Sequence, residues 1–206
     1  MTDDLVRAFS DIPTTCISDA LQGLTNMHPG IKPLKEEYRF AGRALTVVSA
    51  PGDNLAVLKA IRQAKPGDVL VIDLKGDVYR AAAGDFVVGM SKTLGVAAWV
   101  VDGVIRDILG VKALNIPVFC RGITQAAGGK AGLGEVNVPV SCGGVTVHPG
   151  DIVVGDADGV VVVPRASAEF VLAKARQKLA QDEERERKIS GKRDEIIAYL
   201  DKVLNP

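Results

Sequence analysis

Between residues 44 and 122 the chain alternates short apolar runs with segments of helical spacing, and this alternation limits the fold more than any other feature. The apolar runs read ALTVVSA, VLVIDL, GVAAWVVDG and IPVFCRG. Between the first two runs, Leu55, Leu58 and Ile61 recur at helical spacing, behind an Asp53 expected to cap the helix. Alternating strands and helices predict an α/β fold with several parallel strands. Nearly continuous apolar strands predict a sheet covered on both faces.

The parts of the chain on either side of this region show other patterns. From residue 128 on, four short β runs are separated by Gly, Pro and Asp turns, which is typical of hairpins. A long helix is expected after Pro164, followed by a final amphipathic helix. Two short helices are expected at 2–10 and 14–24, the second capped by Thr14 or Thr15. Since neither a linker nor an internal repeat is visible, residues 1–206 are predicted to form one domain.

Charge and composition argue against several classes of partner. Lys+Arg and Asp+Glu both number 25, so the net charge gives no reason to expect nucleic acid or an anionic membrane. Aromatic residues make up 4%, which leaves little stacking surface, although a local RNA-binding patch stays an alternative. We expect no membrane span and no signal peptide. Cys16, Cys120 and Cys142, an odd number at wide spacing, indicate a reducing, cytoplasmic setting.

The stretch VVDGVIRD, residues 100–107, brings two opposite charges to the end of an apolar strand. We expect a turn at Asp102–Gly103 and, after it, the adjacent pair Arg106–Asp107. One interpretation is structural, because Asp107 would favour the positive end of a helix dipole and Arg106 would be exposed. The other is a ligand site, because ligands of open α/β sheets lie beyond the carboxyl ends of strands. Upstream, Gly84 at a predicted helix start offers free N–H groups to a carboxylate or phosphate.

Four segments, in order along the chain, resemble the RraA-like family, which includes the 4-hydroxy-4-methyl-2-oxoglutarate aldolases and the regulators of ribonuclease activity. The segments are PTTCISDAL, GRALTVVSAPGDNLAV, the Gly84–Asp85 step with VVDGVIRD downstream, and CGGVTVHPGDIVVGDADGVVVVP. The resemblance covers all but the last part of the chain. It implies an α/β fold with a layered α/β/β core, similar to the swivelling phosphohistidine domains, and with C-terminal helices added.

The resemblance also implies roles for the residues of the site. The family's aldolases use a divalent metal, usually Mg²⁺ and alternatively another such as Mn²⁺, and no Schiff-base lysine. Asp107 would hold the metal largely through water, and Arg106 would contact the keto oxygen of pyruvate. The pyruvate carboxylate would bind to backbone N–H groups of the loop from Gly84 to Val88. The substrate-binding residues implied in this way are Gly84, Asp85, Phe86, Val87 and Arg106.

The family resemblance further implies an assembly with sites between subunits. A homotrimer or a hexamer is expected, in which an acidic residue from the C-terminal region of a neighbouring subunit helps to hold a water molecule. Glu183 or Glu184 is the nearest match for that residue. The partners expected are therefore a small keto acid and further copies of the chain, with neither nucleic acid nor membrane.

The chemistry of the expected reaction suits these residue types. Cleaving a C–C bond beside a 2-keto acid leaves the enolate of pyruvate, and each positive group fixed in advance lowers the barrier by about 3–4 kcal/mol. Oxygen ligands and retained water suit Mg²⁺ better than Zn²⁺. We therefore expect a metal-dependent lyase that cleaves 4-hydroxy-4-methyl-2-oxoglutarate, or 4-carboxy-4-hydroxy-2-oxoadipate, to pyruvate and a second keto acid. Decarboxylation of oxaloacetate passes through the same enolate. The alternative is a non-catalytic, protein-binding regulator of a ribonuclease.

Other candidate residues have simpler interpretations. Lys75, just past a strand, could be imagined as a Schiff-base lysine but is expected to lie in a turn. The glycine-rich segment 128–134 lacks the spacing and the Lys-Ser/Thr ending of a phosphate loop, and is expected to be a flexible loop. Structural, surface or turn positions are expected for His28, His148, Asp156 and Asp158.

Overall fold

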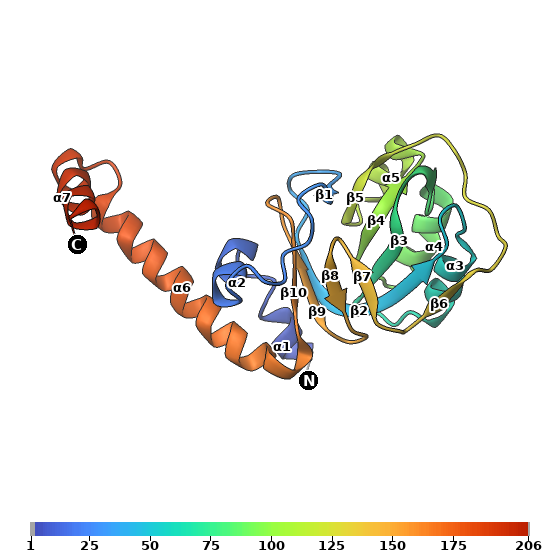
Figure 1. Ribbon diagram of the computed structural model, residues 1–206, viewed down its shortest axis with the longest axis horizontal. Helices are drawn as coiled ribbons and strands as arrows, with labels where there is room; N and C mark the ends of the chain where they lie inside the picture. Colours follow the sequence, from blue (N-terminus) through green and yellow to red (C-terminus); the bar gives the residue numbers. More distant parts are fainter. Residues whose placement is uncertain (1–2, 206) are drawn as a thin grey trace.

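The structure is a computed structural model that describes residues 3–205, and it shows an α/β body from which a helical arm projects (Figure 1). The strands are β1 (Lys32–Pro33), β2 (Phe40–Ser49), β3 (Asp68–Ala81), β4 (Ala98–Ile105), β5 (Val118–Ile123), β6 (Gly134–Val136), β7 (Val140–Cys142), β8 (Val145–Val147), β9 (Ile152–Gly155) and β10 (Val160–Val163). The helices are α1 (Asp3–Arg7), α2 (Thr14–Ala20), α3 (Leu55–Gln63), α4 (Asp85–Thr93), α5 (Ile108–Leu114), α6 (Ala168–Ile189) and α7 (Arg193–Leu204). Among residues 3–205, none of the helices combines the length and apolar character needed to cross a membrane.

One sheet forms the centre of the body. Its strand order is β1-β5-β4-β3-β2-β9-β10, and β6 pairs with the end of β2. Strands β2 to β5 run parallel to one another, whereas β1, β6, β9 and β10 pair antiparallel with their neighbours. Parallel neighbours require crossover connections, and α3, α4 and α5 supply them. The predicted α/β class with several parallel strands is therefore confirmed.

Strand β4 shows why the sequence favours this arrangement. All eight of its residues are buried. Because side chains alternate across a strand, Trp99, Val101 and Ile105 pack under the crossover helices, whereas Ala98 and Val100 face the small hairpin β7–β8. Helices on one face and a second β layer on the other give the layered α/β/β core that the family resemblance implied.

The expected turn at Asp102–Gly103 is wrong, because β4 runs through both residues. The Asp102 carboxylate accepts the N–H of Gly143, at 2.8 Å, and pairs with the Arg121 guanidinium. A Cβ at Gly103 would lie 2.9 Å from Leu74 Cδ1. The Asp-Gly step therefore marks a partly buried ion pair and a close approach of β3, not a change of chain direction.

The start of α2 also differs from its prediction. Pro13 occupies the N-cap position instead of Thr14 or Thr15, and the helix ends at Ala20. The N–H and the hydroxyl of Thr14 both donate to the carboxylate of Asp156, at 2.9 and 2.6 Å. Asp156 lies in the β9–β10 turn, as expected, so an acid far along the chain caps this helix. A local sequence pattern cannot reveal such a cap.

Two predictions about the strands differ from the structure: one concerns the length of a strand, and the other the number of strands. The sequence predicted a strand from the apolar run VLVIDL alone, but β3 continues beyond that run to Ala81, with register shifts along its pairing with β4. The region after residue 128 holds five strands, β6 to β10, where four were predicted. The extension of β3 matters for the site, because it carries the chain directly to the start of α4.

The C-terminal arm begins packed and ends exposed. Ala168, Val171, Leu172 and Ala175 of α6 are buried against α1, α2 and the strands β9 and β10. Beyond them α6 leaves the body, and α7 lies at its far end (Figure 1). Among its described residues α7 has none that is buried.

Candidate active site

The end of β4 delivers Arg106 and Asp107 to the edge of the sheet. The N–H of Arg106 donates to Ala83 O at 3.0 Å, and the N–H of Thr124 donates to Ile105 O at 2.9 Å. The pair is thus held between β5 and the segment that precedes α4. Asp107 takes the N-cap position of α5 in the left-handed conformation (φ 55°, ψ 45°). Asp tolerates that region better than most residues.

Gly84 brings the start of α4 against this pair. A Cβ at position 84 would overlap Asp107 Oδ2 and would lie 3.2 Å from Arg106 Cγ. Since the backbone of Gly84 is extended (φ −117°), the glycine is required for space and not for its conformation. The two charged groups of the pair are themselves close, with Arg106 Nε 3.3 Å from Asp107 Oδ2.

The first turn of α4 offers fewer free N–H groups than the sequence predicts. The N–H of Val88 donates to Gly84 O at 3.1 Å, which excludes it as a ligand donor. The N–H of Phe86 donates to the Asp85 carboxylate at 2.7 Å. Within residues 3–205, the N–H groups of Asp85 and Val87 donate to no protein group. The N–H of Gly84 likewise donates to no group among the described residues, so these three amides are available to an anion at this helix start.

One cavity brings the predicted residues together. It measures about 330 Å³, and its lining includes Gly84, Asp85, Phe86, Val87, Arg106 and Asp107. Arg106 and Asp107 also line a second cavity of about 540 Å³, together with the exposed side chains of Leu109 and Ile123. The six residues that the sequence singled out thus share one concave surface.

Asn54 and Lys130 also line the first cavity, and the sequence reasoning missed both. Asn54 is the N-cap residue of α3, where Asp53 was expected. Lys130 belongs to the glycine-rich segment expected to be a flexible loop. That segment makes specific contacts, since the N–H of Asn54 donates to Gly129 O at 2.9 Å and the N–H of Gly132 donates to Asp53 Oδ2 at 2.9 Å. The one feature of the sequence that could have pointed to Lys130 is its position as a single charged residue in a glycine-rich segment.

Asp53 joins α3 to this loop. Its carboxylate accepts the N–H of Leu55 at 2.8 Å through Oδ1, and that of Gly132 through Oδ2. These backbone donors, with Leu55 first, lower the pKa of Asp53 below its usual value. Asp53 therefore bonds to the start of α3, but the predicted N-cap is wrong by one position, because Asn54 occupies it.

The carboxylates of the cavity suit a hard cation. Asp85 and Asp107 supply oxygen atoms from α4 and from the end of β4. Asp85 is held against α5, because a Cβ at Gly110 would overlap its Oδ2. Over residues 3–205, no group of three or more His, Cys, Asp or Glu is placed to hold a metal ion. Two carboxylates fit a cation that keeps several of its waters, as Mg²⁺ does.

The other candidates lie away from this cavity. Lys75 follows the buried Asp73 and pairs with it, Nζ to Oδ2, at 2.7 Å. The Nδ1 atom of His28 accepts the N–H of Gly30 at 2.9 Å, and the backbone N–H of His148 donates to Asp151. An ammonium held by a carboxylate is a poor Schiff-base nucleophile, because that reaction needs the neutral amine.

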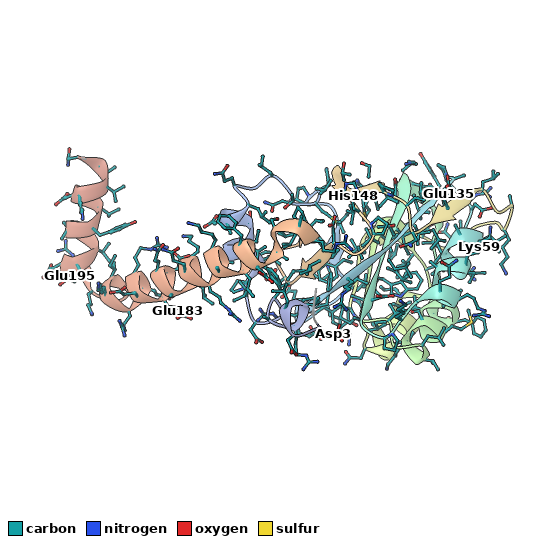
Figure 2. The ribbon with its side chains drawn as sticks, turned by 90° about the horizontal axis from the view of Figure 1, so that it is seen from below. Asp3, Lys59, Glu135, His148, Glu183 and Glu195 are labelled. Atoms are coloured by element: carbon teal, nitrogen blue, oxygen red, sulfur yellow. The ribbon has the colours of Figure 1, made fainter. Side chains whose placement is uncertain are left out.

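Glu183 and Glu184 lie on the exposed half of α6. Glu184 pairs with Lys188 at 2.6 Å. Figure 2 shows Glu183 out on the arm, well away from the body. Neither residue therefore approaches the Arg106–Asp107 cavity within one chain, and a role at a site would require a second copy.

Comparison with known proteins places this cavity in a family. The family model described as RraA-like, Aldolase/RraA, matches residues 14–162, which include every cavity residue named above. The chain belongs to the RraA-like family. A relative from Halalkalibacterium halodurans, provisionally named a 4-hydroxy-4-methyl-2-oxoglutarate aldolase, is 61% identical over 98% of this chain and 97% of its own.

Two solved structures of RraA-like proteins share the fold. RraAS2 of Streptomyces coelicolor, described as an unusual member of the RNase ES inhibitor RraA family, has a TM-score of 0.80 and 31% identity, over 89% of this chain and 96% of its own. A Thermus RraA, described as an RNA-processing inhibitor, has a TM-score of 0.68 and 32% identity over 75% and 93%. The RraA-like family model ends before α6, so the arm lies outside it.

Proposed function

We propose that this RraA-like protein is a metal-dependent lyase. It would cleave 4-hydroxy-4-methyl-2-oxoglutarate, or 4-carboxy-4-hydroxy-2-oxoadipate, to pyruvate and a second keto acid, and it would decarboxylate oxaloacetate. The observation that carries the proposal is the meeting, in one cavity, of the Arg106–Asp107 pair and the free amides of Asp85 and Val87. The relative at 61% identity that is provisionally named as such an aldolase supports the same reaction.

Asp107 and Asp85 would hold the metal, Mg²⁺ or another divalent ion such as Mn²⁺. When bound, it would supply positive charge for the enolate oxygen that forms as the C–C bond breaks. The Asp107 carboxylate is about half exposed, with Gly84 packed against it, so it can bind a cation without a backbone shift.

The residues of the chain would bind and orient the substrate. The amides of Asp85 and Val87, at the positive end of α4, would receive the carboxylate of the pyruvate part. The Arg106 guanidinium, adjacent to Asp107, would donate to the keto oxygen and share the negative charge of the enolate. Because the guanidinium already lies beside Asp107 before the reaction, its stabilisation of the enolate would need little reorganisation at the transition state.

The test is release of pyruvate from 4-hydroxy-4-methyl-2-oxoglutarate by the parent protein, by Asp107→Asn and by the parent with a chelator. We expect the Asn variant to fold and to lose about 100-fold or more in turnover. Chelator should abolish turnover, and added Mg²⁺ or Mn²⁺ should restore it. Turnover that resists chelator but is lost after borohydride reduction with pyruvate would instead support Lys75 as a Schiff-base residue.

A non-catalytic regulator of a ribonuclease is the second candidate. It is favoured by the two solved relatives described as RNase or RNA-processing inhibitors. Exposed apolar side chains near the cavity, Phe86 and Leu109, give a surface that a protein partner could cover. An active parent protein whose turnover is lost in Asp107→Asn decides for the lyase. A protein with no turnover on either keto acid, which slows RNA cleavage by a ribonuclease, decides for the regulator.

We further propose a homotrimer or a hexamer in which the arm contacts a second copy. Support comes from α7, which exposes Ile196, Leu200 and Val203 to solvent at 37%, 47% and 54%. Apolar side chains repeated along one helix face favour a partner over water. Glu183 or Glu184 would then approach the cavity of a neighbouring copy and hold a water there.

A further inference from the structure

The last part of β3 loses its regular pairing as it approaches the site. Asp77 of β3 lies opposite Gly103 of β4. The next residue of β4, Val104, lies opposite Ala81, at the very end of β3. Residues 78–80 therefore have no partner on β4 and form a bulge with exposed side chains. Bulges are frequent next to active sites, where they bend a strand and change the direction of its side chains.

The hydroxyl of Thr124, just after β5, supplies a contact to this bulge that the sheet does not provide. Thr124 Oγ1 donates to Tyr79 O at 3.1 Å and accepts the N–H of Ala126 at 3.3 Å. The N–H of Ala81 in turn donates to Ala126 O at 2.9 Å. These three hydrogen bonds close a ring between the end of β3 and the segment after β5. The ring, which we call the Thr124 bracket, consists of Tyr79, Ala81, Thr124 and Ala126.

The Thr124 bracket holds the segment that leads into the site. Two residues beyond Ala81, the carbonyl of Ala83 accepts the N–H of Arg106 at 3.0 Å. Gly84 then packs against the carboxylate of Asp107, and α4 begins at the next residue. A shift of the bulge would therefore move the start of α4 relative to the Arg106–Asp107 pair.

Thr124 also contacts the strand that carries the pair. Its backbone N–H donates to Ile105 O at 2.9 Å, directly before Arg106. Thr124 lines the second cavity together with Arg106 and Asp107, but among residues 3–205 its hydroxyl bonds only to the two groups of the bracket. The side chain thus connects the ends of β3 and β4 through the backbone.

We infer that Thr124 is a positioning residue of the lyase: its hydroxyl fixes the start of α4 relative to Arg106 and Asp107. This inference rests on the proposed lyase function, in which the substrate carboxylate binds to α4 and the keto oxygen to Arg106. A substrate held on a displaced α4 would still bind, but its keto oxygen would be out of line with the guanidinium. A displacement of about 1 Å can cost about 100-fold in rate.

The test begins with Thr124→Val, which replaces the hydroxyl by a methyl group of similar size. We expect kcat for cleavage of 4-hydroxy-4-methyl-2-oxoglutarate to fall by about 10–100-fold. KM should stay within about twofold, because the interaction that is lost acts in the transition state and the amides of α4 still bind the carboxylate. Exchange of the pyruvate C3 protons with deuterium should slow by the same factor as kcat, since it passes through the same enolate.

Thr124→Ser keeps the hydroxyl and should restore most of kcat. Thr46→Val is the matched control, because Thr46 is a buried residue of β2 that lines neither cavity and whose hydroxyl donates to Val138 O at 2.5 Å. Thr46→Val and Thr124→Val should each lower the melting temperature by about 2–4 °C. Thr46→Val should nevertheless keep the parent kcat, which separates a loss of stability from a loss of position.

Thr124→Ala is measured in the same way, so that the result does not depend on the folding of one variant. A parent-like kcat in folded Thr124→Val or Thr124→Ala would overturn the positioning role while the lyase stands. An equal fall in Thr46→Val, or a Thr124→Ser protein as slow as Thr124→Val, would overturn it as well. A parent protein with neither exchange nor cleavage would overturn the lyase, and the role of Thr124 with it.

Discussion

The carboxylate of Asp107 lies in the space that a side chain at position 84 would need, so Gly84 and Asp107 are sterically coupled. We predict that Gly84→Ala folds but displaces Asp107 from its position against α4. Turnover should fall by about 100-fold, because a misplaced charged group loses most of its effect on a transition state. The free energy of unfolding should fall by no more than about 1 kcal/mol, which is the usual effect of Ala at an N-cap. Steady-state kinetics and urea unfolding measure the two quantities.

Gly89→Ala is the control for this prediction. Gly89 lies in the same helix, and a Cβ there would meet only Leu114 side-chain atoms, at 3.7 and 3.8 Å. Ala is a better helix former than Gly in a helix interior. Gly89→Ala should therefore keep its turnover and gain up to about 1 kcal/mol of stability. Equal turnover in the two variants would show that Asp107 does not depend on the space at Gly84.

Ser91 and Trp99 tie α4 to β4 beneath the site. Trp99 Nε1 donates to Ser91 Oγ at 2.8 Å, and the hydroxyl donates to Val88 O at 2.7 Å, with Ser91 and Trp99 both fully buried. Ser91→Ala leaves the indole N–H without an acceptor and should cost about 1–3 kcal/mol of unfolding free energy. Urea unfolding followed by circular dichroism measures the loss.

Thr93→Ala is the comparison for Ser91→Ala. Thr93 is an exposed residue of α4 whose hydroxyl bonds only to Gly89 O, at 3.0 Å. An exposed substitution of this kind changes stability by about 0.5 kcal/mol or less. Since Trp99 is the one tryptophan of the sequence, its fluorescence reports on Ser91 directly. Identical emission and stability in the two variants would exclude the proposed tie.

The sequence predicted those structural features that depend on residues close together along the chain. Continuous apolar runs identified β4 and the parallel sheet, and the order of strands and helices fixed the crossovers. The end of a buried strand located Arg106 and Asp107. A glycine at a predicted helix start identified the segment at Gly84, and the family resemblance assigned it to the same site as Asp107, which it contacts in the fold.

Structural features that depend on contacts between residues far apart in the sequence could not be predicted in this way. The cap of α2 comes from Asp156, which follows the helix by most of the chain. Lys130 lines the cavity from a loop that is bonded to Asp53 and Asn54, which are distant from it in the sequence. Asp102 resembled a turn residue because an Asp-Gly step usually marks one, but its ion pair with the partly buried Arg121 overrides that preference.

Acid should weaken the link between α3 and the loop that carries Lys130. Backbone donors lower the pKa of Asp53, with Leu55 first, so the ionised form contributes stability in the fold. A lowered folded pKa means that this contribution is present above the ordinary value of 3.8 and is lost as the pH falls through the folded value. Asp53→Asn can accept only one of the two N–H groups.

The difference in the free energy of unfolding between the parent and Asp53→Asn should therefore be largest near neutral pH. It should shrink as the pH falls below about 4. Thermal unfolding at a series of pH values measures it. Asp68→Asn is a useful comparison, because Asp68 accepts a single backbone N–H, from Lys65 at 2.8 Å. A difference that grows toward acid pH would contradict the assigned role of Asp53.

The last prediction concerns the arm. Ala198, Tyr199 and Lys202 of α7 line a shallow pocket shared with α6, and the exposed side chains of Ile196 and Leu200 lie outside that lining. In a second copy these two could find the apolar surface that they lack in their own chain. The parent should therefore elute at three or six times its 21.7 kDa mass. Leu200→Asp should weaken assembly by about 10–100-fold in concentration, since burying such a side chain contributes about 1.5–3 kcal/mol.

Asn205→Asp adds the same charge at the end of α7 and should leave the mass unchanged. Light scattering over a dilution series measures both, and a parent that stays monomeric at every concentration would rule out a role for α7 in joining copies.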